Sequence, residues 1–417
     1  TDLGKSGLSI ATLHWNKPSG QKGSASASGR LSENMQLRVE DLSIEAGTLS
    51  ARGEAAYDPT DAVLTINLGS AALGQTLLNN LAVSRDPKNG TRISVAGGRL
   101  DLEPLLGPDS RPADNEEDKR GTTTSSVVDK KGAGSAPGAF YIDVSKLEQV
   151  FFSQDRFLED VSFSGMYNDG AWQSIRLSGR NPYSTEQNSS AGSRGSATRL
   201  ATGEFNFNFG LPAHGDYPLS IEVQDLGSLL VTALDSHMLT GGYLTIQGES
   251  SEALLTAPIN ASVKLDRFTV MKANLLTQLL NVASLDHPIE TLRTKGLAFD
   301  SIAGELTLSG QRLSTDLMRA HGGTLGLTIT GNMDFEQETI DLHGGVIPLY
   351  RVSNVLAKIP LLKNVLVGDD GQGVIALDYT LTGSSGDPAI TVIPGLLLTP
   401  KALRHIYDSS ASEQQAD

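Results

Sequence analysis

The sequence contains no cysteine, and this absence excludes disulfides, thiolate metal sites and cysteine nucleophiles. Aromatic residues make up only 5% of the 417 residues and charged residues only 19%, whereas glycine occupies 44 positions. Few bulky residues and many glycines favour numerous short strands joined by turns over long helices. A chain of this length forms either two or three ordinary domains or one elongated repeat array without a single core.

Basic residues are also scarce, because 33 Lys and Arg stand against 48 Asp and Glu, for a formal net charge of -15. Nucleic-acid binding needs clustered basic residues, so no nucleic-acid partner is expected. The longest apolar runs, residues 228–234 and 393–399, are far shorter than the roughly 20 residues of a membrane-spanning helix. No signal-peptide pattern opens the chain. We therefore expect a soluble fragment of a longer protein, with any membrane anchor upstream of Thr1.

Strict alternation of apolar and polar residues recurs along the chain and predicts half-buried antiparallel strands. The clearest example is Phe205, Phe207 and Phe209, which alternate with two asparagines. The same pattern places one apolar face at Leu64, Ile66, Leu68, Ile259, Ala261, Val263, Leu265, Leu306, Leu308, Leu325, Leu327, Ile329, Ile375, Leu377, Tyr379 and Leu381. The sequence offers too few helices and aromatic residues to cover so many strands, so we expect an apolar face that stays open.

Turn-forming residues separate the predicted strands, at residues 96–98, 309–310, 321–323 and 384–388. Short helices are predicted at 274–283, 352–359 and 399–406, and a short turn at 288–295. A polar loop is expected at 184–196. The expected organisation is β-groove repeats at 1–107 and 139–224, a disordered insertion at 108–138, a C-terminal region at 225–408 and a disordered tail at 409–417.

Motifs that carry catalytic or metal chemistry are missing from the sequence. Zinc-protease, nucleophile-elbow, phosphate-loop and dinucleotide-binding patterns do not occur. His321 and His343 fall in neighbouring predicted strands without an obvious carboxylate or third ligand, which favours ordinary surface histidines. Residues 369–373 (DDGQG) are interpreted as a hairpin turn and not as a calcium or phosphate loop. We predict no catalytic residue, no metal and no cofactor; a β-solenoid enzyme acting on carbohydrate is the enzymatic alternative.

The second half of the chain carries short motifs in a defined order. They begin with residues 225–230 (DLGSLL), 239–246 (LTGGYLTI), 265–270 (LDRFTV), a leucine-rich segment at 275–280, and 296–300 (GLAFD). They continue with 326–335 (GLTITGNMDF), 340–344 (IDLHG), 359–362 (IPLL) and 383–388. In this order, residues 225–407 resemble the C-terminal region of the AsmA-like envelope proteins, which are counted among the bridge-like lipid transfer proteins. Residues 98–106 (GRLDLEPLL) resemble a repeat-end motif of the same family, whereas Lys363 and Ile393 depart from its pattern.

The resemblance implies a mainly β fold: an elongated, twisted, U-shaped antiparallel groove built from hairpins, with a few short helices near the C-terminal end. It also implies a periplasmic protein, anchored in the inner membrane, whose apolar groove carries phospholipid between the inner and outer membranes. The candidate residues for contact with acyl chains are Phe205, Phe207, Phe209, Ile259, Val263, Leu306, Leu308, Leu325, Leu327, Ile329, Ile375, Leu377 and Tyr379. The alternative is a scaffold for outer-membrane biogenesis that contacts envelope proteins without carrying lipid.

Overall fold

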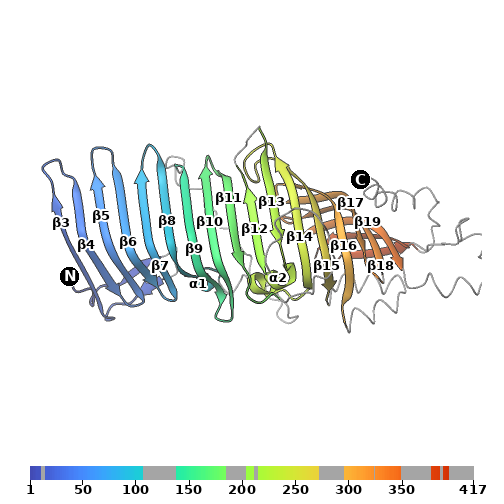
Figure 1. Cartoon of the computed structure of the whole chain (residues 1–417), viewed down its shortest axis with the longest axis horizontal. Coiled ribbons are helices and arrows are strands. Elements are labelled where there is room, and N and C mark those ends of the chain that lie inside the picture. The colour runs from blue at the N-terminus through green and yellow to red at the C-terminus, as the bar shows by residue number, and fades with distance from the viewer. Residues whose placement is uncertain are drawn as a thin grey trace, which may run out of the picture. The chain divides into compact units, whose positions relative to one another are not determined.

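Figure 1 shows the computed structural model, which describes residues 1–10, 15–106, 138–184, 203–210, 215–271, 295–323, 325–348, 377–385 and 388–393. Contacts divide the chain into two units. The N-terminal unit comprises Thr1–Gln224, Ser228–Ser236 and Glu252–Thr256, and the C-terminal unit comprises Asp225–Gly227, His237–Ser251 and Ala257–Asp417. Strands dominate the described part of both units, so the predicted mainly β, hairpin-built class is confirmed.

The N-terminal unit contains a sheet whose strands follow one another in chain order (Figure 1). These strands are β3 (Gly23–Leu31), β4 (Leu37–Ala46), β5 (Leu49–Asp58), β6 (Val63–Leu73), β7 (Thr76–Asp86), β8 (Gly90–Asp101), β9 (Phe140–Ser153), β10 (Arg156–Asn168), β11 (Ala171–Arg180), β12 (Glu204–Phe209) and β13 (Tyr217–Val223). A separate pair is formed by β1 (Leu8–Ile10) and β2 (Trp15–Lys17). The short helix α1 (Glu103–Leu106), which was not predicted, follows β8.

The C-terminal unit is built from consecutive antiparallel strands. They are β14 (Leu239–Ser250), β15 (Ile259–Val270), β16 (Leu297–Ser309), β17 (Arg312–His321), β18 (Leu325–Asp334), β19 (Thr339–Pro348), β20 (Leu377–Ser384) and β21 (Ala389–Ile393). The predicted helices at 274–283, 352–359 and 399–406, the residues 108–137 of the predicted insertion and the loop at 369–373 lie outside the described residues. So do most of the polar loop at 184–196 and the turn at 288–295, and the whole of the tail at 409–417.

One pair in the N-terminal sheet departs from the expected antiparallel hairpins. Strands β8 and β9 are parallel, with Thr91 opposite Phe140 and Val95 opposite Val144. Parallel neighbours need a long crossover connection, because the chain must return to the same end of the sheet. The segment between these two strands, which includes α1, supplies that length.

Residues with positive φ angles form the tight turns that join neighbouring strands. Asp169 and Gly170 join β10 to β11 with φ angles of 51° and 83°, as a two-residue hairpin turn requires.

The prediction of a turn at residues 96–98 is wrong, because these residues lie inside β8. Gly98 has a φ of 121°, and a Cβ there would lie 2.0 Å from the carbonyl oxygen of Leu77. Glycine at this position therefore permits the close approach of β7, and does not end the strand.

Helix α2 (Leu226–Leu234) begins within the motif at residues 225–230 (DLGSLL). It is followed by Asp235, whose φ of 59° lies in the left-handed region that terminates many helices. The Nη1 of Arg156 donates to the carbonyl oxygen of Val231 at 3.1 Å, and the Thr232 hydroxyl donates to Oδ1 of Asn181 at 3.3 Å. These contacts hold α2 against the start of β10 and the residue that follows β11.

Candidate functional site

One face of the N-terminal sheet carries apolar side chains in matching register. Residues directly opposite one another in a ladder share a face, so the register defines rows that cross the sheet. One row, named here the inner row, contains no polar residue from β6 to β13: Leu68, Leu81, Val95, Val144, Phe163, Leu177, Phe207 and Ile221. The face that carries the inner row is named the apolar face.

A second row lies beside the inner row on the apolar face. This middle row consists of Ile66, Val83, Ile93, Ile142, Gly165, Ile175, Phe209 and Leu219. At its one glycine, Gly165, a Cβ would lie 2.6 Å from the ring of Trp172 and 3.0 Å from that of Phe163. These rings therefore occupy the space above Gly165, and the apolar surface is continuous across the gap in the row.

The opposite face of the same strands is polar. One row across it reads Asn67, Ala82, Ser94, Asp143, Ser164, Arg176, Asn208 and Ser220. The Ser162 and Ser178 hydroxyls are 2.7 Å apart on neighbouring strands of this face. The sheet is thus amphipathic over β6–β13, as the alternation in the sequence predicts.

Coverage of the apolar face is uneven. Seven of the eight inner-row side chains are half-buried, and the eighth, Val95, is 6% exposed. Residues toward the end that α2 contacts are buried, with Val161, Phe205 and Val223 between 5% and 7% exposed, and in the middle row Phe209 and Leu219 are 0% and 8% exposed. The inner row is therefore apolar and still partly accessible, whereas the end near α2 and the middle row over β12 and β13 are closed.

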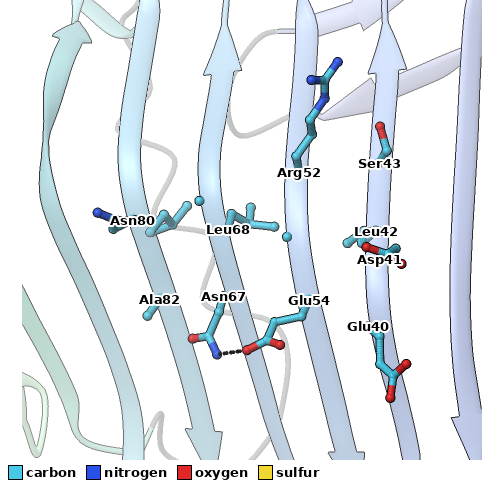
Figure 2. Close-up of a pocket in the computed structure, with 13 residues that line it drawn as sticks. Glu40, Asp41, Leu42, Ser43, Arg52, Glu54, Asn67, Leu68, Asn80 and Ala82 are labelled. Atoms are coloured by element: carbon cyan, nitrogen blue, oxygen red, sulfur yellow. Dashed lines mark hydrogen bonds between the residues drawn. The ribbon is translucent and has the colours of Figure 1, made fainter.

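Two hollows lie on the polar face. The larger, with a volume of about 680 Å³, spans β4–β7 and is lined by Glu40, Asp41, Arg52, Glu54 and Asn67 among others. Figure 2 shows Glu54 and Asn67 facing each other from adjacent strands, where the Asn67 amide donates to Glu54 at 3.1 Å. The second hollow, of about 460 Å³, is bounded by Ser162, Ser164, Arg176, Asn206 and Asn208 among others. Apolar residues also line them, Leu42, Leu68 and Leu81 in the larger and Val144, Phe163, Leu177 and Phe207 in the second, but the charged and amide side chains in both disfavour acyl chains.

The C-terminal unit has an apolar row of its own, and three of its residues belong to a buried core, against which the half-buried Ile302 and Leu327 pack. It consists of Leu265, Ile302, Ala320, Leu327, Val346 and Leu377 on consecutive strands. Leu265, Ala320 and Val346 are 7%, 6% and 1% exposed and belong to one buried cluster. The rings of Phe268 and Phe299 stack within that cluster, with centroids 5.3 Å apart.

The lipid-contact candidates predicted from the sequence lie either on the apolar face of the N-terminal unit or in the C-terminal unit. Phe205, Phe207 and Phe209 share the apolar face of β12, with Phe207 half-buried and the other two buried. In the C-terminal unit Ile259 and Tyr379 are buried. The half-buried candidates are Val263, Leu306, Leu308, Leu327 and Ile329. Leu325 and Leu377 belong to β18 and β20, and Ile375 lies outside the described residues.

Six residues of the inner row were not identified from the sequence: Leu81, Val95, Val144, Phe163, Leu177 and Ile221. The signal that could have found them is the alternation at 140–144 and 175–177. It is partly hidden because Tyr141, which points to the polar face, also counts as apolar in a sequence pattern.

The two histidines singled out in the sequence are not on neighbouring strands. Strand β18 lies between β17, which carries His321, and β19, which carries His343. His321 lies 3.2 Å from the Ser301 hydroxyl, and His343 has a nearby carboxylate after all, Asp341 at 3.3 Å. Among the described residues no group of three or more His, Cys, Asp and Glu side chains is placed to hold a metal ion.

Comparisons of the chain with protein-family models, with curated proteins and with solved structures found no match. Within the described part of the chain, no helix has the length and apolar character needed to cross a membrane. The apolar face is therefore the feature of the molecule that points to a function.

Proposed function

We propose that the chain is the periplasmic part of a lipid transfer protein, and that its apolar face shelters phospholipid acyl chains between the inner and outer membranes. The observation that carries the proposal is the inner row, in which each of eight neighbouring strands contributes one apolar residue. Seven of these eight residues are half-buried. The family resemblance of residues 225–407 supports the cellular setting, including an anchor in the inner membrane.

Energetics favour such a surface for this task. Extracting a phospholipid into water exposes its acyl chains at about 0.8 kcal/mol per CH₂, which gives a barrier of roughly 20 kcal/mol or more for two chains. An apolar surface lowers that barrier because it replaces part of the bilayer contact. With about 4.8 Å between paired strands, a row over eight strands extends about 34 Å, slightly more than the roughly 30 Å hydrocarbon thickness of a bilayer.

Photo-crosslinking tests the proposal on both faces of one strand. A photo-reactive residue at Phe207, on the inner row, should capture phospholipid from loaded protein. The same residue at Asn206, the adjacent position on the polar face, is the matched control and should capture little. Equal capture at both positions, or capture at Asn206 alone, would show that the apolar face does not hold the lipid.

A further inference from the structure

A third row borders the apolar face at the ends of its strands, and it carries a charge. This rim row consists of Tyr57, Leu64, Arg85, Thr91, Phe140, Tyr167 and Trp172, paired in turn across β5–β11. Arg85 is opposite Leu64 on one side and Thr91 on the other. Because Val83 lies two residues before it on β7, Arg85 shares the face of the middle row.

The charge of Arg85 is isolated. Among the described residues of the inner, middle and rim rows, Arg85 is the one with an ionised side chain. No hydrogen bond or ion pair among the described residues involves its guanidinium, and its side chain is exposed. Nearby charges are engaged elsewhere: Lys88 pairs with Asp61 at 2.9 Å, the Asp86 carboxylate accepts hydrogen bonds from the Lys88 backbone and the Asn89 amide, and Arg92 lies over the ring of Tyr141 on the polar face.

The rest of the rim row has the chemistry of a boundary between apolar and aqueous surroundings. Tyrosine and tryptophan combine a large apolar ring with one polar group, which suits them to such boundaries. Tyr167 and Trp172 pack edge to face with ring centroids 5.5 Å apart, while Tyr57 is 40% exposed. The middle and inner rows, which follow along each strand, offer only apolar contacts. An amphiphile bound on this face therefore meets polar groups at the rim and apolar side chains beyond it.

We propose that Arg85 binds the phosphate of a phospholipid at this rim, so that the headgroup lies at the rim row and the acyl chains extend over the middle and inner rows. This inference depends on the proposed function and adds an orientation and an anionic headgroup subsite to it. A guanidinium presents paired N–H donors that match phosphate oxygens, and no described residue accepts a hydrogen bond from that of Arg85. Phosphate is also the anionic group that all phospholipids share, and it complements an isolated cation beside an apolar surface.

Lipid retention tests the subsite. The protein is loaded from mixed micelles with phosphatidylglycerol or with diacylglycerol of the same chains, and the lipid that remains after gel filtration is quantified. Arg85→Gln should lower retained phosphatidylglycerol about threefold to tenfold, the loss expected for an exposed charge-assisted contact. It should leave diacylglycerol, which lacks the phosphate, unchanged. Arg92→Gln, whose side chain is on the polar face opposite Ser84, is the matched control and should change neither lipid.

A second experiment tests the orientation of the bound lipid. A photo-reactive residue at Thr91, beside Arg85 in the rim row, should attach to the glycerol and headgroup end of bound phosphatidylglycerol. The same residue at Leu81, in the inner row, should attach to the acyl chains, and fragmentation of the adduct by mass spectrometry distinguishes the two. Acyl attachment at Thr91, or an equal loss of both lipids in Arg85→Gln, overturns the headgroup assignment while leaving lipid binding intact. If the native protein retains neither lipid, the proposed function fails, and this inference fails with it.

Discussion

At the scale of single residues, the phenol of Tyr379 shows how burial changes the pKa of a side chain. Its hydroxyl donates to the carbonyl oxygen of Thr328 at 2.8 Å, and Tyr379 is 5% exposed within the buried cluster of the C-terminal unit. Burial raises the pKa of Tyr379 to about 12, because the phenolate form would be desolvated there. The sequence placed Tyr379 among the lipid-contact candidates, and the structure places it in a closed core.

We expect the stability of the C-terminal unit to depend on Tyr379 at alkaline pH. A raised folded pKa means that the full contribution is present below the unfolded value of about 10 and is lost as pH rises toward 12. Urea unfolding between pH 8 and pH 12 should therefore show native protein losing roughly 2 to 3 kcal/mol relative to Tyr379→Phe across this window. At pH 8 the variant should be about 1 kcal/mol less stable, since it lacks one hydrogen bond. Parallel pH profiles for the two proteins would contradict the assignment.

At the scale of elements, adjacent glycines in β19 show how closely three strands approach one another. Gly344 is opposite Tyr379 of β20, and a Cβ on Gly344 would lie 1.8 Å from the Thr328 carbonyl oxygen and 2.7 Å from the Tyr379 hydroxyl. A Cβ on Gly345 would have its nearest neighbour at 3.4 Å. The hydrogen bond of Tyr379 thus passes over a glycine whose missing side chain leaves room for it.

Gly344→Ala should destabilise the C-terminal unit by about 2 kcal/mol or more, because a backbone oxygen must move to admit the methyl group. Gly345→Ala is the matched control on the next residue and should change stability by less than about 1 kcal/mol. Thermal and urea unfolding of the two variants give the comparison. Similar losses for both would mean that the close approach over Gly344 is not what requires glycine.

At the scale of the whole molecule, the same alternation of apolar and polar residues has different results in the two units. Both carry an apolar row across consecutive strands, yet seven of the eight inner-row residues of the N-terminal unit are half-buried, whereas Leu265, Ala320 and Val346 of the C-terminal row belong to a buried cluster. An apolar face that is closed contributes to stability, while one that stays accessible has apolar area left for a ligand.

A charge introduced into each row should separate these roles. Ile66→Asp, at a half-buried position of the middle row, should abolish lipid retention at a cost in stability below about 2 kcal/mol, because the carboxylate still reaches water. Leu265→Asp, at 7% exposure, should unfold the C-terminal unit, since it buries an unpaired charge. Circular dichroism during urea unfolding and lipid retention after gel filtration measure both effects. Unfolding by Ile66→Asp would show that the N-terminal row is an ordinary core.

The sequence by itself determined the fold class and which residues of a strand share a face, because side chains alternate with the two-residue period of the extended backbone. It therefore placed Phe205, Phe207 and Phe209 together, and likewise Leu64, Ile66 and Leu68. Only the tertiary structure decided the register, since pairing joins residues that are distant in the chain and no local pattern encodes it. Register, including the parallel pair β8–β9, aligns Arg85 with Thr91 and Phe140 at the rim. Burial was decided in the same way, because what covers a strand depends on contacts from elsewhere in the chain.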